Sequence, residues 1–153
     1  AKTEMEVIKE LASNDKSYRS LTQSWFKNSP LLEIIQQASQ LGFRLIITTD
    51  HGTINVKNPS KVIGDKNTSL NLRYKTGRSL SYEEKDVLAF KNPKDALLPT
   101  INMSSSFIFA RGDLFFAYPN NYNHYVSYYR NTYQHGGVSM EEMIIPFSIL
   151  DPK

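Results

Sequence analysis

The chain has 153 residues, no cysteine and a net charge of +3. This length is sufficient for one domain with its own hydrophobic core. The lack of cysteine excludes disulfides, cysteine-ligated zinc and a cysteine nucleophile, and it leaves Asp, Glu and His as possible metal ligands. No stretch approaches the roughly 18 apolar residues of a membrane span, and the charged N-terminal residues do not form a secretory signal. The sequence therefore predicts a cytoplasmic protein without membrane insertion.

The N-terminal third of the chain predicts two helices. A capping box begins at Thr3, and apolar residues at helical spacing then predict a helix over residues 3–13. Residues 17–28, SYRSLTQSWFKN, are interpreted as a short connector. A Ser-Pro pair at residues 29–30 is typical of a helix start, so the second helix is expected from residue 30 to about residue 41. Gly42 then stands where a terminating glycine is expected.

The next segment, FRLIITT at residues 43–49, predicts a buried strand, and helix, glycine and strand together predict one unit of a doubly wound or related α/β sheet. Ligands of such sheets bind beyond the carboxyl ends of the strands, where Asp50, His51 and Gly52 follow. Asp50 and His51 could reach one divalent cation if Gly52 allows a sharp turn. The alternative is a local turn in which Asp50 caps N–H groups and His51 lies on the surface.

The middle of the chain predicts short strands. Residues 53–56 alternate like a strand, and a glycine turn is expected at Thr76-Gly77. Residues 107–110 and 114–118 read as two strands that a tight Arg-Gly-Asp turn joins into a hairpin. Residues 91–99 are expected to form a loop or a single helical turn.

Tyrosine is concentrated between residues 118 and 133. Tyr122, Tyr125, Tyr129 and Tyr133 approximate helical spacing, which predicts an amphipathic helix docked by its aromatic face. A stacking platform for nucleobases is the alternative interpretation of the same residues. His124 lies in this segment and is expected to be a surface residue rather than a metal ligand.

The second informative stretch is YQHGGVSMEEMIIPFSIL, residues 133–150. His135 is followed by two glycines, which would let the backbone fold closely around a ligand or metal. A capping box starting at Ser139 predicts a short helix, and a terminal strand is expected after it. Pro146 would restrict that strand to an edge or a bulge.

Taken together, the segments TTDHGT and HGGVSMEEMIIP resemble the alkaline phosphatase superfamily and, within it, the PglZ domain. The segments NLRYKTGR and LTQSWFKNSPLLEII are also similar to PglZ. The nearest resemblance is to PorX-type two-component response regulators of Bacteroidetes, in which a PglZ domain follows a receiver domain and a helical linker. The implied fold is α/β, specifically the C-terminal portion of an alkaline phosphatase-like α/β sandwich with a mixed sheet.

The resemblance also implies a site with two divalent metals, usually zinc, beside a threonine or serine nucleophile. Asp50 and His51 would hold one metal and His135 the other. In two-metal catalysis one cation activates the nucleophile while the other stabilises charge on the phosphoryl and leaving-group oxygens. No histidine precedes His51, so the missing ligands and the nucleophile are expected upstream of residue 1. The chain is therefore expected to be the C-terminal part of a larger domain and to be inactive by itself.

Basic residues are concentrated between residues 57 and 78, with Asp65 as the single acid. The resemblance suggests that Arg73, Lys75 and Arg78 bind the phosphates of a substrate. In the alternative, Arg73 and Lys75, which alternation places on the same face of a strand, pair with carboxylates in the core.

Three functions compete. The first is a metal-dependent phosphodiesterase or phosphatase in the intact protein, with oligonucleotides as an expected substrate. It would be controlled by receiver phosphorylation and dimerisation and would regulate type IX secretion. The second is a non-catalytic adaptor that binds a sigma factor or a secretion component. The third is a nucleic-acid binder, whose affinity would fall steeply with salt. A homodimer is also expected if an apolar face is exposed.

Overall fold

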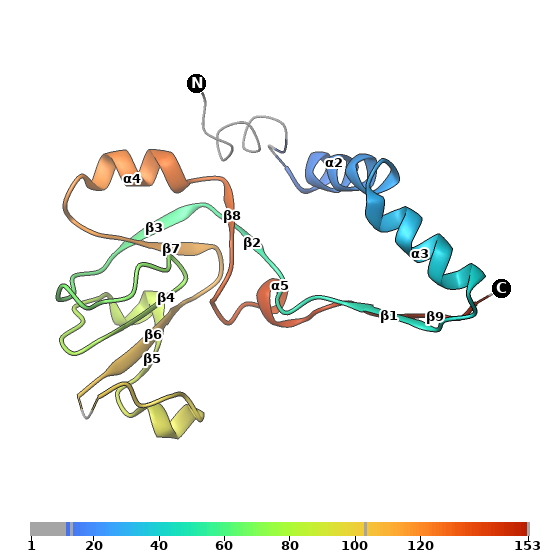
Figure 1. Ribbon diagram of the computed structural model, residues 1–153. Coiled ribbons are helices and arrows are strands. Elements are labelled where there is room, and N and C mark those ends of the chain that lie inside the picture. The colour runs from blue at the N-terminus through green and yellow to red at the C-terminus, as the bar shows by residue number, and fades with distance from the viewer. Residues whose placement is uncertain (1–11, 13, 103, 153) are drawn as a thin grey trace. The chain divides into compact units, whose positions relative to one another are not determined.

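The computed structural model describes residue 12, residues 14–102 and residues 104–152, and it has a mixed α/β fold (Figure 1). Its helices are α2 (Asp15–Lys27), α3 (Pro30–Gln40), α4 (Tyr122–Tyr129) and α5 (Met140–Met143), with 3-10 turns η1 (Glu84–Asp86) and η2 (Pro93–Ala96). Its strands are β1 (Leu45–Thr48), β2 (Ile54–Val56), β3 (Asn58–Lys61), β4 (Tyr74–Gly77), β5 (Val87–Phe90), β6 (Ser106–Ala110), β7 (Leu114–Ala117), β8 (Thr132–Gln134) and β9 (Phe147–Leu150). The helix predicted over residues 3–13 lies outside the described residues. None of the described helices combines the length and apolar composition that a bilayer crossing requires.

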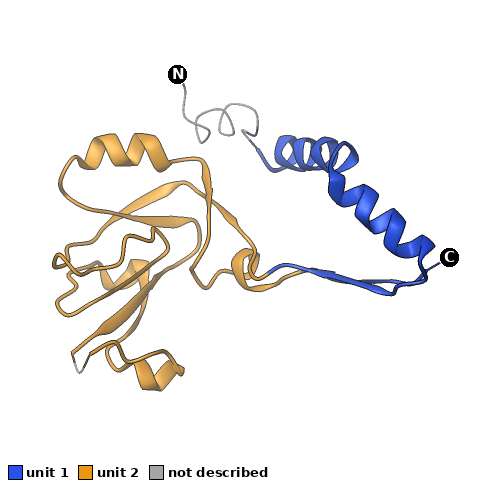
Figure 2. Cartoon of the chain, in the orientation of Figure 1, with its two compact units in different colours: residues 1–49, 146–153 blue, residues 50–145 orange. Residues whose placement is uncertain are grey.

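The chain divides into two compact units, which Figure 2 colours separately. Unit 1 comprises residues 1–49 and 146–153, and its described elements are α2, α3, β1 and β9. Unit 2 comprises residues 50–145 and contains the remaining elements. Every candidate ligand and phosphate-binding residue predicted from the sequence belongs to unit 2.

In unit 1, the second predicted helix is confirmed as α3, with Ser29 as its N-cap and Gly42, at φ +79°, just after its last turn. The predicted connector before it was wrong, because those residues form most of α2. The side chain of Asn14 accepts a hydrogen bond from the backbone N–H of Ser17 at 3.0 Å and so caps that helix. The cap lies before the segment interpreted as a connector, whose polar composition concealed the helix.

The strand expected after α3 is also present, but its predicted burial was wrong. β1 pairs antiparallel with β9 in a two-stranded sheet, with Leu45 opposite Leu150 and Thr48 opposite Phe147. Ile46 is 60% exposed. An apolar run indicates that a strand is suited to burial, but a two-stranded ribbon leaves both faces open, so the run does not create a buried, doubly wound arrangement here.

Unit 2 contains three small sheets with both strand directions. β4, β6 and β5 form an antiparallel sheet in that order, β2 pairs antiparallel with β8, and β3 pairs parallel with β7. The expected strand at residues 53–56 corresponds to β2, and the expected helical turn at residues 91–99 corresponds to η2. The predicted turn at Thr76-Gly77 was wrong, since both residues pair with β6 at the end of β4.

β6 and β7 lie where the sequence predicted two strands, but the predicted hairpin was wrong. A turn does form, with Gly112 at φ +48° and the N–H of Leu114 donating to the carbonyl of Arg111 at 3.1 Å. The strands then separate, because β6 pairs with β4 and β5, whereas β7 pairs with β3. A tight turn fixes the local chain reversal, but competing partners from distant residues decided the pairing.

β7 lies between two clusters of buried side chains. Phe116 belongs to a cluster with Val62, Val87, Ile108 and Ala110, and Phe115 to one with Ile54, Val56 and Ala117. Successive strand residues point to opposite faces, so β7 contributes to both clusters. Tyr122, Val126 and Tyr129 of α4 pack against the second cluster, which confirms the docked face for two of the four tyrosines. Tyr125 is 39% exposed, and Tyr133 lies in β8 instead.

Candidate metal centre

The segment Asp50-His51-Gly52 forms a compact loop at the start of unit 2. Asp50 Oδ1 accepts a hydrogen bond from the backbone N–H of His51 at 3.1 Å and lies 3.7 Å from His51 Nε2. His51 Nδ1 is 2.9 Å from the carbonyl oxygen of Gly52. If Nδ1 is the protonated nitrogen, that carbonyl accepts its hydrogen and Nε2 faces the carboxylate as a possible ligand. The loop thus shows both expected features: Asp50 accepts a local backbone hydrogen bond, and Asp50 and His51 place two possible metal ligands close together.

His135, far away in the sequence, lies beside this loop. Its imidazole stacks on that of His51, with ring centroids 3.8 Å apart and planes 9° from parallel. The Asn71 side chain donates to the carbonyl oxygen of His135 at 3.3 Å. The structure therefore brings together the two histidines that the sequence singled out. His124, the third histidine of the chain, stacks instead on Tyr128 in α4.

Glu142 of α5 holds both histidine loops in place. One carboxylate oxygen accepts hydrogen bonds from the backbone N–H of Gly137 at 2.9 Å, and the other accepts from that of Ser139 at 3.2 Å. The backbone carbonyl of Glu142 accepts from the N–H of Gly52 at 2.8 Å. The predicted capping box at Ser139 is confirmed. It was the only sequence signal for Glu142, and it did not reveal that this residue also supports the loop of His51.

Two glycines permit this close approach. A Cβ atom on Gly52 would lie 2.0 Å from the carbonyl oxygen of Glu141, and one on Gly137 would lie 2.6 Å from the carboxylate of Glu142. Any side chain at either position would push its loop away from α5. A glycine within two residues of each histidine is therefore required by packing around the candidate centre.

Arg73 forms a buried ion pair with Glu142. The side chains are 0% and 1% exposed, and the guanidinium donates through Nε to Oε1 at 2.9 Å and through Nη2 to Oε2 at 2.8 Å. Nη1 also donates to the carbonyl of Leu114. Burial by itself would raise the pKa of Glu142, but hydrogen bonds from Arg73, Gly137 and Ser139 outweigh it and lower the pKa below its usual value. Arg73 thus makes the core contact considered as the alternative to substrate binding.

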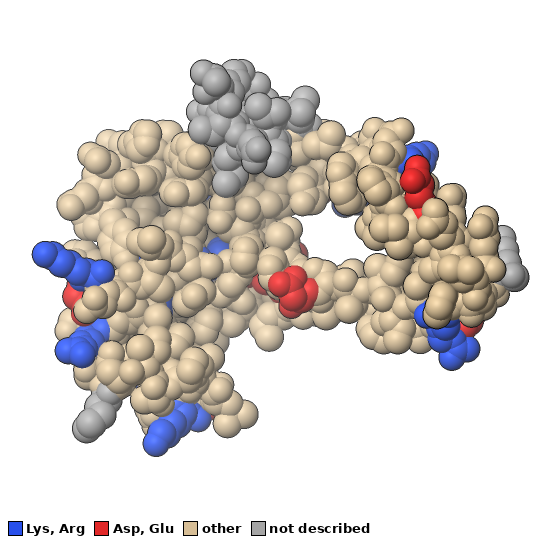
Figure 3. Space-filling model, viewed as in Figure 1, with Lys and Arg blue, Asp and Glu red and all other residues tan. Residues whose placement is uncertain are grey.

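Lys75 and Arg78, the other basic residues singled out for phosphate binding, have different environments. Lys75 is 1% exposed, and its Nζ donates to the carbonyl oxygen of Ser69 at 2.8 Å. Arg78 lies on the surface. Arg73, Lys75 and Arg78 therefore do not form one exposed surface in the described structure. On the face shown in Figure 3, Lys and Arg side chains occur as small separate groups rather than as one patch.

Burial of Lys75 predicts a pH dependence of stability. Burial lowers the pKa of Lys75 from 10.5 to about 8. Between these values the unfolded chain binds a proton that the folded chain does not, so the contribution of Lys75 to the free energy of unfolding rises with pH. Below the folded pKa both states are protonated and the contribution is constant. Urea unfolding of the wild type should therefore show a rise between about pH 8 and pH 10 that Lys75→Met lacks. Identical pH profiles for the two proteins would contradict this expectation.

Asp50, His51 and His135 are chemically suited to zinc, which binds imidazole nitrogen and carboxylate oxygen. The Asp50 and His51 donors face each other within reach of one ion. The ring centroids of His51 and His135 lie 3.8 Å apart, a spacing similar to the roughly 3.5–4 Å between the ions of two-metal sites. Over the described part of the chain, no set of three or more His, Cys, Asp or Glu side chains could hold a metal ion by itself.

Comparison with known proteins identifies a family. A sequence model described as the BREX system PglZ alkaline phosphatase-like domain matches residues 1–149, nearly the whole chain. No curated protein matches it.

Proposed function

Because the chain belongs to the PglZ alkaline phosphatase-like family, we propose that it forms part of the metal centre of a phosphatase or phosphodiesterase. Asp50 and His51 contribute to one zinc site and His135 to a second. The remaining ligands and the nucleophile are proposed to come from a part of the protein that precedes residue 1. Bound zinc would supply Lewis-acid chemistry and lower the pKa of the nucleophile.

The stack of His51 on His135 is the observation that carries this proposal. These imidazoles come from loops that are distant in the sequence, and their rings are 3.8 Å apart. Exposed histidines have no general reason to meet in this way, and stacking them restricts both rings. The support from Glu142, which binds both loops, fixes their separation before any metal binds. Preorganised ligands are favourable for a centre that must hold two cations close together.

Zinc binding to the three histidine variants tests the proposal. In a longer protein that supplies the remaining ligands, we expect His51→Ala and His135→Ala each to lower the zinc retained after dialysis, as measured by elemental analysis. His124→Ala is the matched control, since it removes an exposed imidazole outside the centre, and it should retain the wild-type amount. In a longer protein that includes the missing ligands, the wild type should hold about two zinc ions and hydrolyse a phosphodiester. Wild-type zinc content in both His51→Ala and His135→Ala would contradict the proposed metal centre.

We propose, on the sequence resemblance alone, that the intact protein is a cytoplasmic PorX-type response regulator that hydrolyses oligonucleotides and regulates type IX secretion. Hydrolysis of short oligonucleotides by the intact protein, compared before and after phosphorylation of its receiver domain by acetyl phosphate, tests this assignment. A rate of hydrolysis that phosphorylation does not change would contradict the proposed regulation and would leave the phosphodiesterase activity itself standing.

An adaptor function is the second candidate, favoured by the exposed apolar side chains of unit 1. Trp25 is 61% exposed, Ile46 60% and Phe147 64%. Such side chains are suited to a protein partner such as a sigma factor, a secretion component or a second copy of the chain. In this case alanine at Asp50, His51 and His135 would leave partner binding intact. Loss of partner binding in those variants would argue against it.

A further inference from the structure

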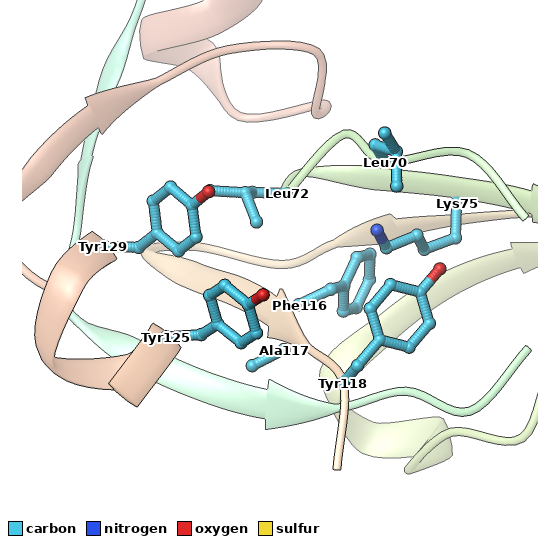
Figure 4. Close-up of a pocket in the computed structure, with 8 residues that line it drawn as sticks. All are labelled: Leu70, Leu72, Lys75, Phe116, Ala117, Tyr118, Tyr125 and Tyr129. Carbon is cyan, nitrogen blue, oxygen red and sulfur yellow. The ribbon is translucent and has the colours of Figure 1, made fainter. Parts of the chain in front are cut away.

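A pocket of about 230 Å³ lies within unit 2, against β4, β7 and α4 (Figure 4). Leu72, Phe116 and Ala117 provide apolar lining. The size is sufficient for a substituted aromatic ring, since an apolar protein cavity of about 150 Å³ holds benzene. None of the predicted metal ligands lines this pocket. Its chemistry is therefore independent of the candidate metal centre.

Three tyrosines give the pocket aromatic walls with polar ends. Tyr125 and Tyr129 lie one turn apart on α4, with rings 14° from parallel, and Tyr118 follows β7. In Figure 4 their rings surround the space beside Phe116. Burial raises the pKa of Tyr118 and of Tyr129, so both hydroxyls are protonated at neutral pH, and that of Tyr118 donates to the carbonyl oxygen of Ser69 at 3.5 Å.

Lys75 brings a positive charge to this apolar site. Its Nζ points into the region between Leu70 and Tyr118, lies 4.6 Å from the centroid of the Tyr118 ring, and donates one hydrogen bond to Ser69. Among the described residues, no carboxylate lies within ion-pair distance of Nζ, although an ammonium has three hydrogens to donate. Burial lowers the pKa of Lys75 to about 8, so the group is still mostly charged at pH 7. A buried charge without an opposite charge is unfavourable.

We propose that this pocket binds a small organic anion, in which a flat aromatic ring carries one carboxylate or phosphate group. The anion pairs with Lys75, and the ring packs against Phe116 and the tyrosine walls. A charged donor at one end and aromatic surface at the other discriminate against neutral aromatic compounds and against small anions without a ring. The pocket thus has one polar anchor in a mainly apolar lining, the usual composition of a small-molecule site.

Calorimetric titration of the whole chain with four probes tests the proposal. Benzoate carries a carboxylate, and phenylphosphonate carries a non-hydrolysable analogue of a phosphate group. Benzamide is neutral, and inorganic phosphate lacks the ring. We expect saturable binding of benzoate or phenylphosphonate, and whichever binds more tightly identifies the anionic group. Benzamide and inorganic phosphate should bind at least about tenfold more weakly than the preferred probe. Equal affinity for benzamide or for inorganic phosphate, or no binding of either aromatic anion, would overturn the proposal.

Substitutions then locate the site. Lys75→Met, which removes the ammonium group and keeps an unbranched apolar stem, should weaken the preferred probe by about tenfold or more. Arg78→Met is the matched control, because it removes the same charge from an exposed position nearby in the sequence, and it should bind as the wild type does. His51→Ala should also leave the affinity unchanged, so a failure of the metal centre is distinguishable from a failure of this pocket. Wild-type affinity in Lys75→Met would place the ligand elsewhere.

A labelling experiment on the wild-type chain does not depend on the folding of a variant. Acetic anhydride should acetylate Lys75 more slowly when phenylphosphonate or benzoate is present, as measured by mass spectrometry of digested protein. Lys61, which is exposed and lies over the ring of Tyr122, should react at the same rate with and without the probe. An unchanged rate at Lys75 would contradict binding beside this amine.

Discussion

Replacement of Glu142 by alanine is expected to lower the free energy of unfolding by about 3 to 5 kcal/mol, because it leaves the Arg73 guanidinium buried without an opposite charge. Both side chains are essentially unexposed, so water cannot replace the lost carboxylate. The same change removes the acceptor for the backbone N–H groups of Gly137 and Ser139. Urea unfolding of the variant and the wild type measures the loss. A difference below about 1 kcal/mol would show that the pair behaves like an exposed one.

Glu141→Ala is the matched control for this experiment. Glu141 is the exposed neighbour on the same helix, and its side chain can be removed without leaving a buried charge.

The dependence of stability on acid pH provides a second measurement of the role of Glu142. The pKa of Glu142 is lowered in the folded state, so its contribution is present above the unfolded value and is lost as pH falls through the folded value. The wild type should therefore lose stability in acid below pH 4.5 more steeply than Glu142→Gln does.

Replacement of Gly52 by alanine is expected to separate the two histidine loops and to cost about 3 kcal/mol of stability, the upper end for overpacking. The added Cβ would lie 2.0 Å from the carbonyl oxygen of Glu141. Since this neighbour is backbone, the loop of His51 must move away from α5. The hydrogen bond from the N–H of Gly52 to the carbonyl of Glu142 would lengthen, and the imidazole stack would be lost.

Proton NMR of the imidazole hydrogens tests the local effect, because stacked rings shift each other's resonances. Separation should move the signals of His51 and His135 and leave that of His124 unchanged. Gly112→Ala is the control for conformational strain without a clash, since Gly112 has φ +48° and a Cβ there would meet no atom within 4 Å. It should cost about 1 to 2 kcal/mol and leave the histidine signals in place. Wild-type histidine signals in Gly52→Ala would contradict the role assigned to this glycine.

The elements predicted correctly share a local cause. α3 starts at a Ser-Pro pair and ends before Gly42, and α5 starts at a capping box, so each is defined by residues within a few positions. α2 was missed although its cap is equally local, because Asn14 lies before the polar segment interpreted as a connector. The burial predicted for β1 was wrong because the apolar pattern of a strand does not reveal which residues cover it.

The sequence by itself determined the segments around His51 and His135, their supporting glycines and the family to which the chain belongs. Residue type and short spacing are sufficient for such motifs, because their hydrogen bonds and turns involve near neighbours. Only the tertiary structure decided that Arg73 pairs with Glu142, that Lys75 faces a pocket and that β7 pairs with β3. Each of these contacts joins residues distant in the chain, and the sequence offered several chemically acceptable partners. The packing of the whole of unit 2 selects among them, since the buried Arg73–Glu142 pair and the β3–β7 pairing must fit the same core at the same time.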